Sequence, residues 1–203
     1  MRLVVPVSGS DPKTRLATVL TPEERRAFTE AMLSDVLEAL DGAGHSPEVV
    51  STAPVDCDAP CTVDERGLNP LVNDLLAGTD GRLAIVMADL PLLTPAAVER
   101  LFEPDADVVL APGLGGGTNA VVCRHPDFRV DYHGASIRDH RRLADEAGAT
   151  RAEVDSRRLA TDIDEPSDLA EVLVHDDGAA AEWLRAAGFE VAASEGRVAV
   201  ERP

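Results

Sequence analysis

One short polar loop carries the charges that binding a nucleotide's phosphates requires. It follows the apolar run at residues 3–7 and contains Lys13, Thr14 and Arg15. Lys13 is the only lysine of the chain, whereas arginine occurs 18 times. Two cations in a loop after a strand can clamp a triphosphate, because ammonium and guanidinium groups both bind phosphate oxygens. We therefore expect Lys13, Thr14 and Arg15 to bind a nucleotide, with Lys13 and Arg15 taking part in catalysis.

This loop also faintly resembles the P-loop pattern Gly-x-x-x-x-Gly-Lys-Thr, with Gly9 ahead of Lys13. Two differences argue against a P-loop. Pro12 stands where the second glycine must be, and the N-cap of the next helix is expected at Thr21, well after Lys13. An ordinary solvated loop is the other alternative. Because the chain uses lysine nowhere else, we favour a functional role for Lys13.

Carboxylates follow two further stretches of the chain. Asp89 comes directly after residues 83–88, the most continuous apolar run, and Asp162 and Asp164 precede an expected helix. Carboxylate oxygens are ligands that Mg²⁺ prefers, and a bound Mg²⁺ neutralises charge as pyrophosphate leaves. We therefore predict a Mg²⁺ site made by Asp89 with Asp164 and Asp162, and a catalytic and nucleotide-binding role for Asp89. The alternative for Asp89 is a purely structural turn, and for Asp168 a favourable contact with the helix dipole is preferred.

The elements that must position these residues alternate between strands and helices. Strands are expected at residues 3–7, 48–51, 83–88, 107–111, 119–123 and 151–154, and helices at residues 21–40, 68–76, from 94, 136–147 and 166–173. This alternation predicts an α/β, three-layer Rossmann-like fold with a mostly parallel central sheet and helices on both faces. Ligands bind such sheets at the carboxyl ends of the strands. Lys13 and Asp89 should therefore lie at the same edge.

The length of the chain indicates its number of domains, and its net charge limits the possible partners. A chain of 203 residues suits a single domain, 1–203, with a core at residues 1–174 and a C-terminal appendage at residues 175–203. The net charge of −18 argues against DNA or RNA, which need a basic face. An acid-rich, lysine-poor surface favours a halophile, because a high-GC codon bias explains the arginines but not the acidic excess.

The sequence indicates a cytoplasmic protein without a membrane partner. No apolar run approaches the ~20 residues that span a bilayer, and residues 1–6 are too short and too quickly polar for a signal peptide. The three cysteines, Cys57, Cys61 and Cys123, form neither a disulfide framework nor a four-ligand zinc site. The apolar residues of the C-terminal appendage favour a homodimer.

The motifs in this order resemble the sugar-phosphate nucleotidyltransferase superfamily and, within it, the 2-phospho-L-lactate guanylyltransferase (CofC) family, over residues 1–174. The most specific combination is Lys-Thr-Arg-Leu at 13–16, Gly-Leu-Asn at 67–69 and Gly-Gly-Thr-Asn at 116–119. Asp-Leu-Pro at 89–91 and Asp-x-Asp-x-Pro at 162–166 are shared more widely. The resemblance implies a GT-A-like fold.

The same resemblance implies a reaction. GMP from GTP is joined to 2-phospho-L-lactate, giving lactyl-2-diphospho-5'-guanosine and pyrophosphate, in coenzyme F420 biosynthesis. The acid's phosphate attacks the α-phosphorus in line, with Mg²⁺ as cofactor. Phosphoenolpyruvate or 3-phosphoglycerate are alternative acids. A molybdopterin or sugar-phosphate nucleotidyltransferase is a further alternative, although their Leu-x-Gly-Gly signature is missing, and a non-catalytic nucleotide-binding subunit is a third.

Individual residues take their roles from the family pattern. Thr118, Ser136 and the position of His133 match residues that contact the phosphorylated acid, and Asn69 matches a position near the nucleotide. His133 replaces a glycine of the family, which puts its backbone contact in doubt. Ser8 stands where the family usually has a second lysine, so Lys13 and Arg15 must carry more of the triphosphate charge.

Two residues after Ser136 have open interpretations. His140 and Arg141 lie on the helix expected at residues 136–147, from which they could reach the carboxylate of the acid. A solvated helix face is an equally good interpretation for both.

Overall fold

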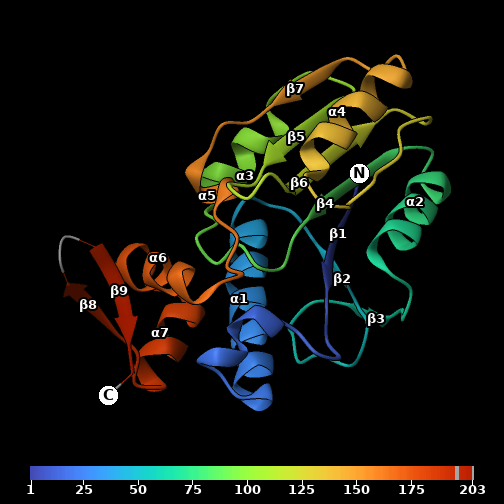
Figure 1. Ribbon diagram of the computed structural model, residues 1–203. Helices are drawn as coiled ribbons and strands as arrows, with labels where there is room; N and C mark the ends of the chain where they lie inside the picture. The colour runs from blue at the N-terminus through green and yellow to red at the C-terminus, as the bar shows by residue number, and fades with distance from the viewer. Residues whose placement is uncertain (195–196, 203) are drawn as a thin grey trace.

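A seven-stranded sheet forms the core of the computed structural model, which describes residues 1–194 and 197–202 (Figure 1). Across the sheet the strands are β3 (Cys61–Val63), β2 (Glu48–Ser51), β1 (Arg2–Val7), β4 (Arg82–Val86), β6 (Thr118–Arg124), β5 (Val108–Pro112) and β7 (Arg151–Glu153). All neighbouring pairs are parallel except those of β6, which runs antiparallel to β4 and β5. The predicted mostly parallel sheet is confirmed.

The reversed direction of β6 follows from the short connection before it. Only residues 113–117 join β5 to β6, and a parallel pair needs a crossover of about a dozen residues or more. β6 therefore begins at the edge where β4 ends. The N–H of Met87 donates to the carbonyl of Asn119 at 2.9 Å, which places Thr118 beside Ala88, the residue before Asp89.

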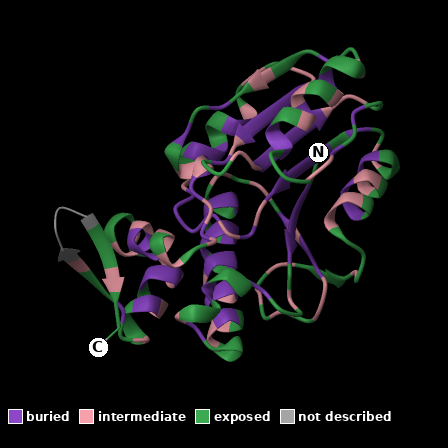
Figure 2. Ribbon diagram, viewed as in Figure 1, coloured by how far each residue is buried: buried purple, intermediate pink, exposed green. Residues whose placement is uncertain are grey.

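Helices cover both faces of the sheet, as predicted. α1 (Pro22–Gly42), α3 (Pro95–Phe102) and the short α5 (Arg157–Ala160) pack on one face, and α2 (Leu68–Gly78) and α4 (Ser136–Glu146) pack on the other. Successive residues of β1 alternate between these faces, with Val5 in one hydrophobic cluster and Val4 in the other. Figure 2 shows the strands buried between the helices.

The start of α1 is fixed by the predicted cap. The Thr21 hydroxyl accepts from the Glu24 N–H at 3.3 Å, and Glu24 accepts from the Thr21 N–H at 2.9 Å. Pro22 occupies the first turn, where its missing N–H costs nothing. A short 3-10 turn (η1, Thr14–Thr18) follows Lys13 directly, but α1 itself begins well after Lys13, at Pro22. The loop that carries Lys13 is therefore not the phosphate-binding turn of a P-loop.

The C-terminal segment packs beside α1, away from the sheet (Figure 1). It contains a 3-10 turn (η2, Pro166–Asp168), α6 (Leu169–His175), α7 (Ala179–Ala186) and the antiparallel pair β8 (Glu190–Ser194) and β9 (Arg197–Glu201). Phe28 and Met32 of α1 share a hydrophobic cluster with Leu169 of α6 and Leu184 of α7. None of the helices in the described ranges is long and apolar enough to cross a membrane.

A buried carboxylate of α1 holds the start of α7. Asp35 is 7% exposed and accepts from the N–H groups of Ala179 at 2.6 Å and Ala180 at 2.9 Å. Burial raises the pKa of Asp35 to about 6, although the two helix N–H groups oppose the shift. The charged form is stabilised at the helix N-terminus but costs desolvation energy.

We expect acidification to stabilise the protein through Asp35. Between its ordinary pKa of 3.8 and the folded value of about 6 the folded state binds the proton more tightly. The free energy of unfolding therefore rises as pH falls from 7 to 5, by roughly 1 kcal/mol from this group. Thermal melts at both pH values in molar salt should show a larger rise for the wild type than for Asp35→Asn. Equal rises in the two proteins would contradict the assignment.

Candidate active site

The loop after β1 holds Lys13 in a constrained backbone conformation. Lys13 has φ 51° and ψ 46°, a left-handed geometry that costs a non-glycine residue about 1 kcal/mol or more. Arg25 of α1 fixes the preceding residues, since its guanidinium donates to the Pro12 carbonyl at 3.0 Å and to Asp11 at 2.5 Å. A Cβ added to Gly9 would lie 2.7 Å from the carbonyl oxygen of Ala53. The surrounding contacts thus define where the Lys13 side chain begins.

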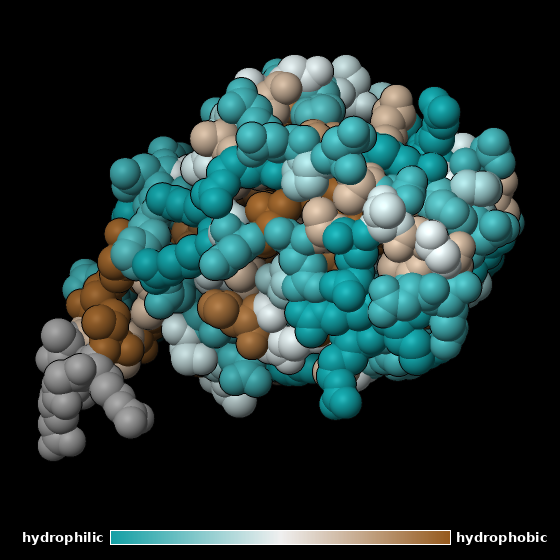
Figure 3. Space-filling model, turned by 90° about the horizontal axis from the view of Figure 1, so that it is seen from above, coloured by the Kyte–Doolittle hydropathy of each residue, from teal (hydrophilic) through white to brown (hydrophobic). Residues whose placement is uncertain are grey.

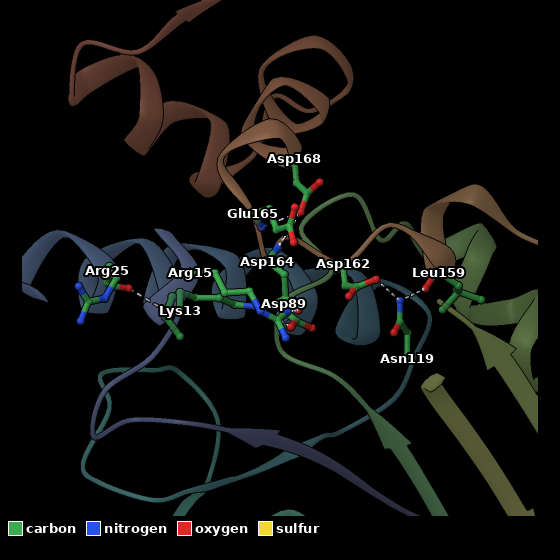
Figure 4. A network of polar contacts seen from close by, with 11 residues as sticks. Lys13, Arg15, Arg25, Asp89, Asn119, Leu159, Asp162, Asp164, Glu165 and Asp168 are labelled. Atoms are coloured by element: carbon green, nitrogen blue, oxygen red, sulfur yellow. Dashed lines mark hydrogen bonds and ion pairs between the residues drawn. The ribbon is translucent and has the colours of Figure 1, made fainter. Parts of the chain in front are cut away.

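The predicted cations and carboxylates meet at the edge of the sheet (Figure 4). The Nζ of Lys13 lies 2.6 Å from Oδ2 of Asp89 and 2.7 Å from Oδ1 of Asp164. Arg15 donates to the second oxygen of Asp164 at 2.8 Å. The Lys13 side chain is only 11% exposed, whereas that of Arg15 is 66% exposed. Lys13 is therefore the central cation of the cluster, and Arg15 lies at its rim.

The ion pairs decide the charges of this cluster. Burial lowers the pKa of the Lys13 amine, but Asp89 and Asp164 more than offset this effect and the pKa is raised. Burial also raises the pKa of Asp164, yet Lys13 and Arg15 together hold the pKa below its ordinary value. Lys13 and Asp164 are consequently charged at neutral pH.

The carboxylates of the cluster are the candidate ligands of a divalent cation such as Mg²⁺. Oδ1 of Asp89 is buried and has no hydrogen-bond partner among the described residues. This oxygen is therefore free to act as a metal ligand. Burial, together with the charges of Asp89 and Asp164, raises the pKa of the nearby Asp162. Asp162 also accepts from Asn119 at 3.0 Å. Within the described ranges, no group of three or more acidic, histidine or cysteine side chains is arranged so that it could hold a metal ion.

A cavity opens directly beside this cluster. Its volume is about 540 Å³, which is large enough for a nucleotide. Lys13, Thr14, Arg15, Asp89 and Asp164 line one part of it, and residues 64, 66, 67 and 68 line another. The predicted nucleotide-binding loop therefore faces a cavity, and the predicted metal ligands Asp89 and Asp164 lie in its wall.

Asn69 has a supporting position next to this cavity. Its amide oxygen accepts from the N–H of Tyr132 at 2.7 Å, and its nitrogen donates to Asp131 at 3.0 Å. The side chain thus holds the loop at residues 131–133, while its neighbour Leu68 lines the cavity. A contact between Asn69 and the nucleotide stays a prediction.

Two of the predicted acid-binding residues lie together. The hydroxyl of Ser136, at the start of α4, donates to the hydroxyl of Thr118 at 3.2 Å, and each residue is 3% exposed. His133 is different, because its ring is 85% exposed and its Nδ1 lies 2.5 Å from Asp131. The N–H of His133 also donates to Asp131 at 3.3 Å. A contact between His133 and the acid stays a prediction.

The two residues with open interpretations differ in the structure. His140 is fully buried and its Nδ1 lies 2.8 Å from the Thr118 hydroxyl, so the alternative of a solvated face is wrong for it. Arg141 instead pairs with Glu153 on β7, at 2.8 and 2.7 Å. A direct contact of Arg141 with the acid would require this bidentate pair to open.

Sequence reasoning missed two positioning residues. Arg25 lies on the same helix stripe as Phe28, Thr29 and Met32, which are all buried, so its place on an apolar face was a signal for a structural ion pair. Asn119 is 5% exposed and donates to the Leu159 carbonyl and to Asp162, both at 3.0 Å. Asn119 belongs to the Gly-Gly-Thr-Asn motif at 116–119, but no feature of the sequence pointed to its bridge to Asp162.

Known proteins that are similar to this chain define its family. A model of the family described as "Guanylyl transferase CofC like" matches residues 1–202. The chain belongs to this family. The match includes the C-terminal segment through β9. Proteins named 2-phospho-L-lactate guanylyltransferase are similar over the whole chain. That of Haloarcula marismortui is 72% identical over 206 residues, covering 100% of this chain and 99% of that protein. That of Haloferax volcanii is 60% identical, covering 100% and 98%.

Solved structures support the fold of this CofC-like chain. A putative nucleotide-diphospho-sugar transferase from Desulfovibrio desulfuricans G20 matches with a TM-score of 0.72 at 14% identity, covering 92% of this chain and 95% of that one. The bifunctional IspDF from Campylobacter jejuni matches with a TM-score of 0.55 at 10% identity, covering 88% of this chain and 55% of that one. At these identities the likeness shows the fold alone, and it agrees with the predicted Rossmann-like architecture.

Proposed function

We propose that this chain transfers the guanylyl group of GTP to 2-phospho-L-lactate. A phosphate oxygen of the acid forms a bond to the α-phosphorus, and the bond between the α- and β-phosphates breaks to release pyrophosphate. The observation that carries the proposal is the cluster of Lys13, Asp89 and Asp164 in the wall of a nucleotide-sized cavity, in a chain 72% identical to a protein with this name. Such a transfer needs positioning and charge neutralisation and no protein nucleophile.

The chain's own residues supply both requirements. Lys13 and Arg15 line the cavity and carry the positive charge that a triphosphate needs. Asp89 and Asp164, with Asp162 nearby, would hold Mg²⁺, which when bound neutralises phosphate charge and orients the leaving pyrophosphate. Lys13 holds the two carboxylates close together, because it bridges them at 2.6 and 2.7 Å.

The acid binds, in this proposal, where the start of β6 meets the start of α4. Thr118 lies beside Ala88 in the sheet, so it is next to the strand end that presents Asp89. The N-terminus of α4, which begins at Ser136, adds partial positive charge. Anionic oxygens of a small phosphorylated acid suit these groups. His133 lies shortly before Ser136 in the sequence.

The proposal extends to the setting in which the enzyme works. The net charge of −18, on a chain whose face in Figure 3 is mostly hydrophilic, supports a halophilic cytoplasm as the solvent. Val174, Val191 and Val198 of the C-terminal segment are 50%, 43% and 58% exposed. These apolar side chains support a homodimer formed through that segment. Charge balance makes nucleic acid an unfavourable partner.

A panel of acids tests the function. Purified protein in molar salt with GTP and Mg²⁺ should release pyrophosphate when 2-phospho-L-lactate is added, and more slowly with phosphoenolpyruvate or 3-phosphoglycerate. ATP in place of GTP should reduce the rate. Absence of pyrophosphate with all three acids would contradict the proposed reaction. A higher kcat/KM for phosphoenolpyruvate would replace the acid while leaving the class of reaction unchanged.

A further inference from the structure

His140 is a buried polar side chain whose purpose is not explained by the packing of α4. It is fully buried, and the ring of Tyr132 meets it edge-on with centroids 4.8 Å apart. An apolar side chain of similar size would fill this place without the cost of desolvating an imidazole. The polar contacts of its two ring nitrogens must therefore account for a histidine at this position.

Those contacts define the tautomer of His140. The backbone N–H of Asp131 donates to Nε2 at 3.0 Å, so Nε2 carries a lone pair and no proton. Burial lowers the pKa of the ring to about 4, although Asp131 and Asp139 oppose the shift. The ring is consequently neutral at pH 7, and its single proton is on Nδ1. Nδ1 lies 2.8 Å from the Thr118 hydroxyl oxygen, to which it must donate.

The Thr118 hydroxyl can then only donate its own proton, because its lone pairs are already used. Its oxygen also accepts from the Ser136 hydroxyl at 3.2 Å, so both of its lone pairs are used. Its own proton has no acceptor among the described residues, because each group within hydrogen-bond distance is itself donating. An aligned O–H donor with no protein acceptor is a site for an anionic oxygen.

We propose that His140 is a positioning residue that makes the Thr118 hydroxyl an obligatory donor toward an anionic oxygen of the phosphorylated acid. The inference rests on the proposed function for the acid itself. His140 touches no substrate, and it acts through Thr118. A hydroxyl fixed in this way favours acids with a charged, unprotonated oxygen over neutral analogues with a hydroxyl at the same position. The charged oxygen only accepts, whereas the hydroxyl of the analogue carries a proton that competes with that of Thr118.

Two substitutions separate this role from packing. Asn in place of His140 puts an amide N–H where Nδ1 lies and so keeps the donor to Thr118. Gln puts its amide group where Nε2 lies and keeps only the contact with the Asp131 N–H. Both variants lose the ring and its packing against Tyr132, so a structural role affects them alike.

We expect His140→Gln to raise the KM for 2-phospho-L-lactate by roughly ten-fold or more, since an unsatisfied or misdirected buried hydroxyl costs about that much. His140→Asn should stay within about three-fold of the wild type, and the KM for GTP should change little in either. In a Thr118→Val background, His140→Gln should have no further effect. Equal KM changes in the two His140 variants, or a full effect of His140→Gln in the Thr118→Val background, overturn the inference.

A measurement without substrate keeps this test independent of the reaction. Long-range ¹H–¹⁵N spectra of the wild-type protein should show His140 protonated on Nδ1 at pH 7, and a ring protonated on Nε2 overturns the inference. Wild-type protein that releases no pyrophosphate with any of the acids overturns the proposed function instead. The two failures are therefore distinguishable.

Discussion

Replacing Lys13 with glycine should lower kcat/KM for GTP by roughly 10³-fold, the upper range for loss of a single charge-stabilising group. Lys13 is the central cation beside the cavity, and its amine bridges Asp89 and Asp164 at 2.6 and 2.7 Å. Glycine removes this side chain and also relieves the left-handed backbone, with φ 51°. Steady-state kinetics of pyrophosphate release measure the loss.

An alanine at the same position separates catalysis from folding. Lys13→Ala lacks the same amine but keeps the backbone strain, so it should be as inactive as Lys13→Gly and about 1 kcal/mol less stable. Arg2→Ala is the control for loss of a positive charge, and it should keep wild-type kinetics. Arg2 pairs with Glu48 at the amino-terminal ends of β1 and β2, opposite to the strand ends that carry the site. Activity of Lys13→Gly within ten-fold of the wild type would contradict the role of Lys13.

The second large effect is expected at Asp89. Asp89→Asn keeps the shape of the side chain but removes the charge and the free buried oxygen Oδ1 as an anionic donor. The rate should fall by about 10²–10³-fold. The backbone carbonyl of Asp89 still accepts from the Ile163 N–H at 3.1 Å, so the turn itself is expected to persist.

Metal binding is the readout that activity alone does not give. Mg²⁺ added without nucleotide should raise the Tm of the wild type, since it binds the folded state, and this rise should be lost in Asp89→Asn. Asp105→Asn makes the same chemical change on an exposed residue and should leave the rise intact. A Mg²⁺-dependent rise that persists in Asp89→Asn would remove Asp89 from the metal ligands.

The charged cluster is the part of the site that the sequence predicted best. Lys13 and Asp89 each follow a short apolar run, and parallel strands bring such positions to one edge. The structure places their charged atoms 2.6 Å apart. Apolar periodicity and caps such as Thr21 also predicted most of the helices and strands, because these signals are local.

Features that depend on tertiary contacts were not predictable from the same signals. β3 is a short edge strand with all three residues exposed, so it has no apolar pattern, and its pairing with β2 alone defines it. The tautomer of His140 depends on the backbone of Asp131, nine residues away in the chain. The direction of β6, in contrast, could have been predicted from the five-residue connection before it.

The most direct measurement follows the phosphates of GTP through the reaction with 2-phospho-L-lactate. GTP labelled with ³²P at either the α- or the γ-phosphate is incubated with protein and Mg²⁺ in molar salt, and the products are separated. For guanylyl transfer we expect the α-label in a new nucleotide that also contains the acid, and the γ-label in pyrophosphate. Transfer of the γ-label to the acid, or α-label that remains only in GTP and its hydrolysis products, would contradict guanylyl transfer by this chain.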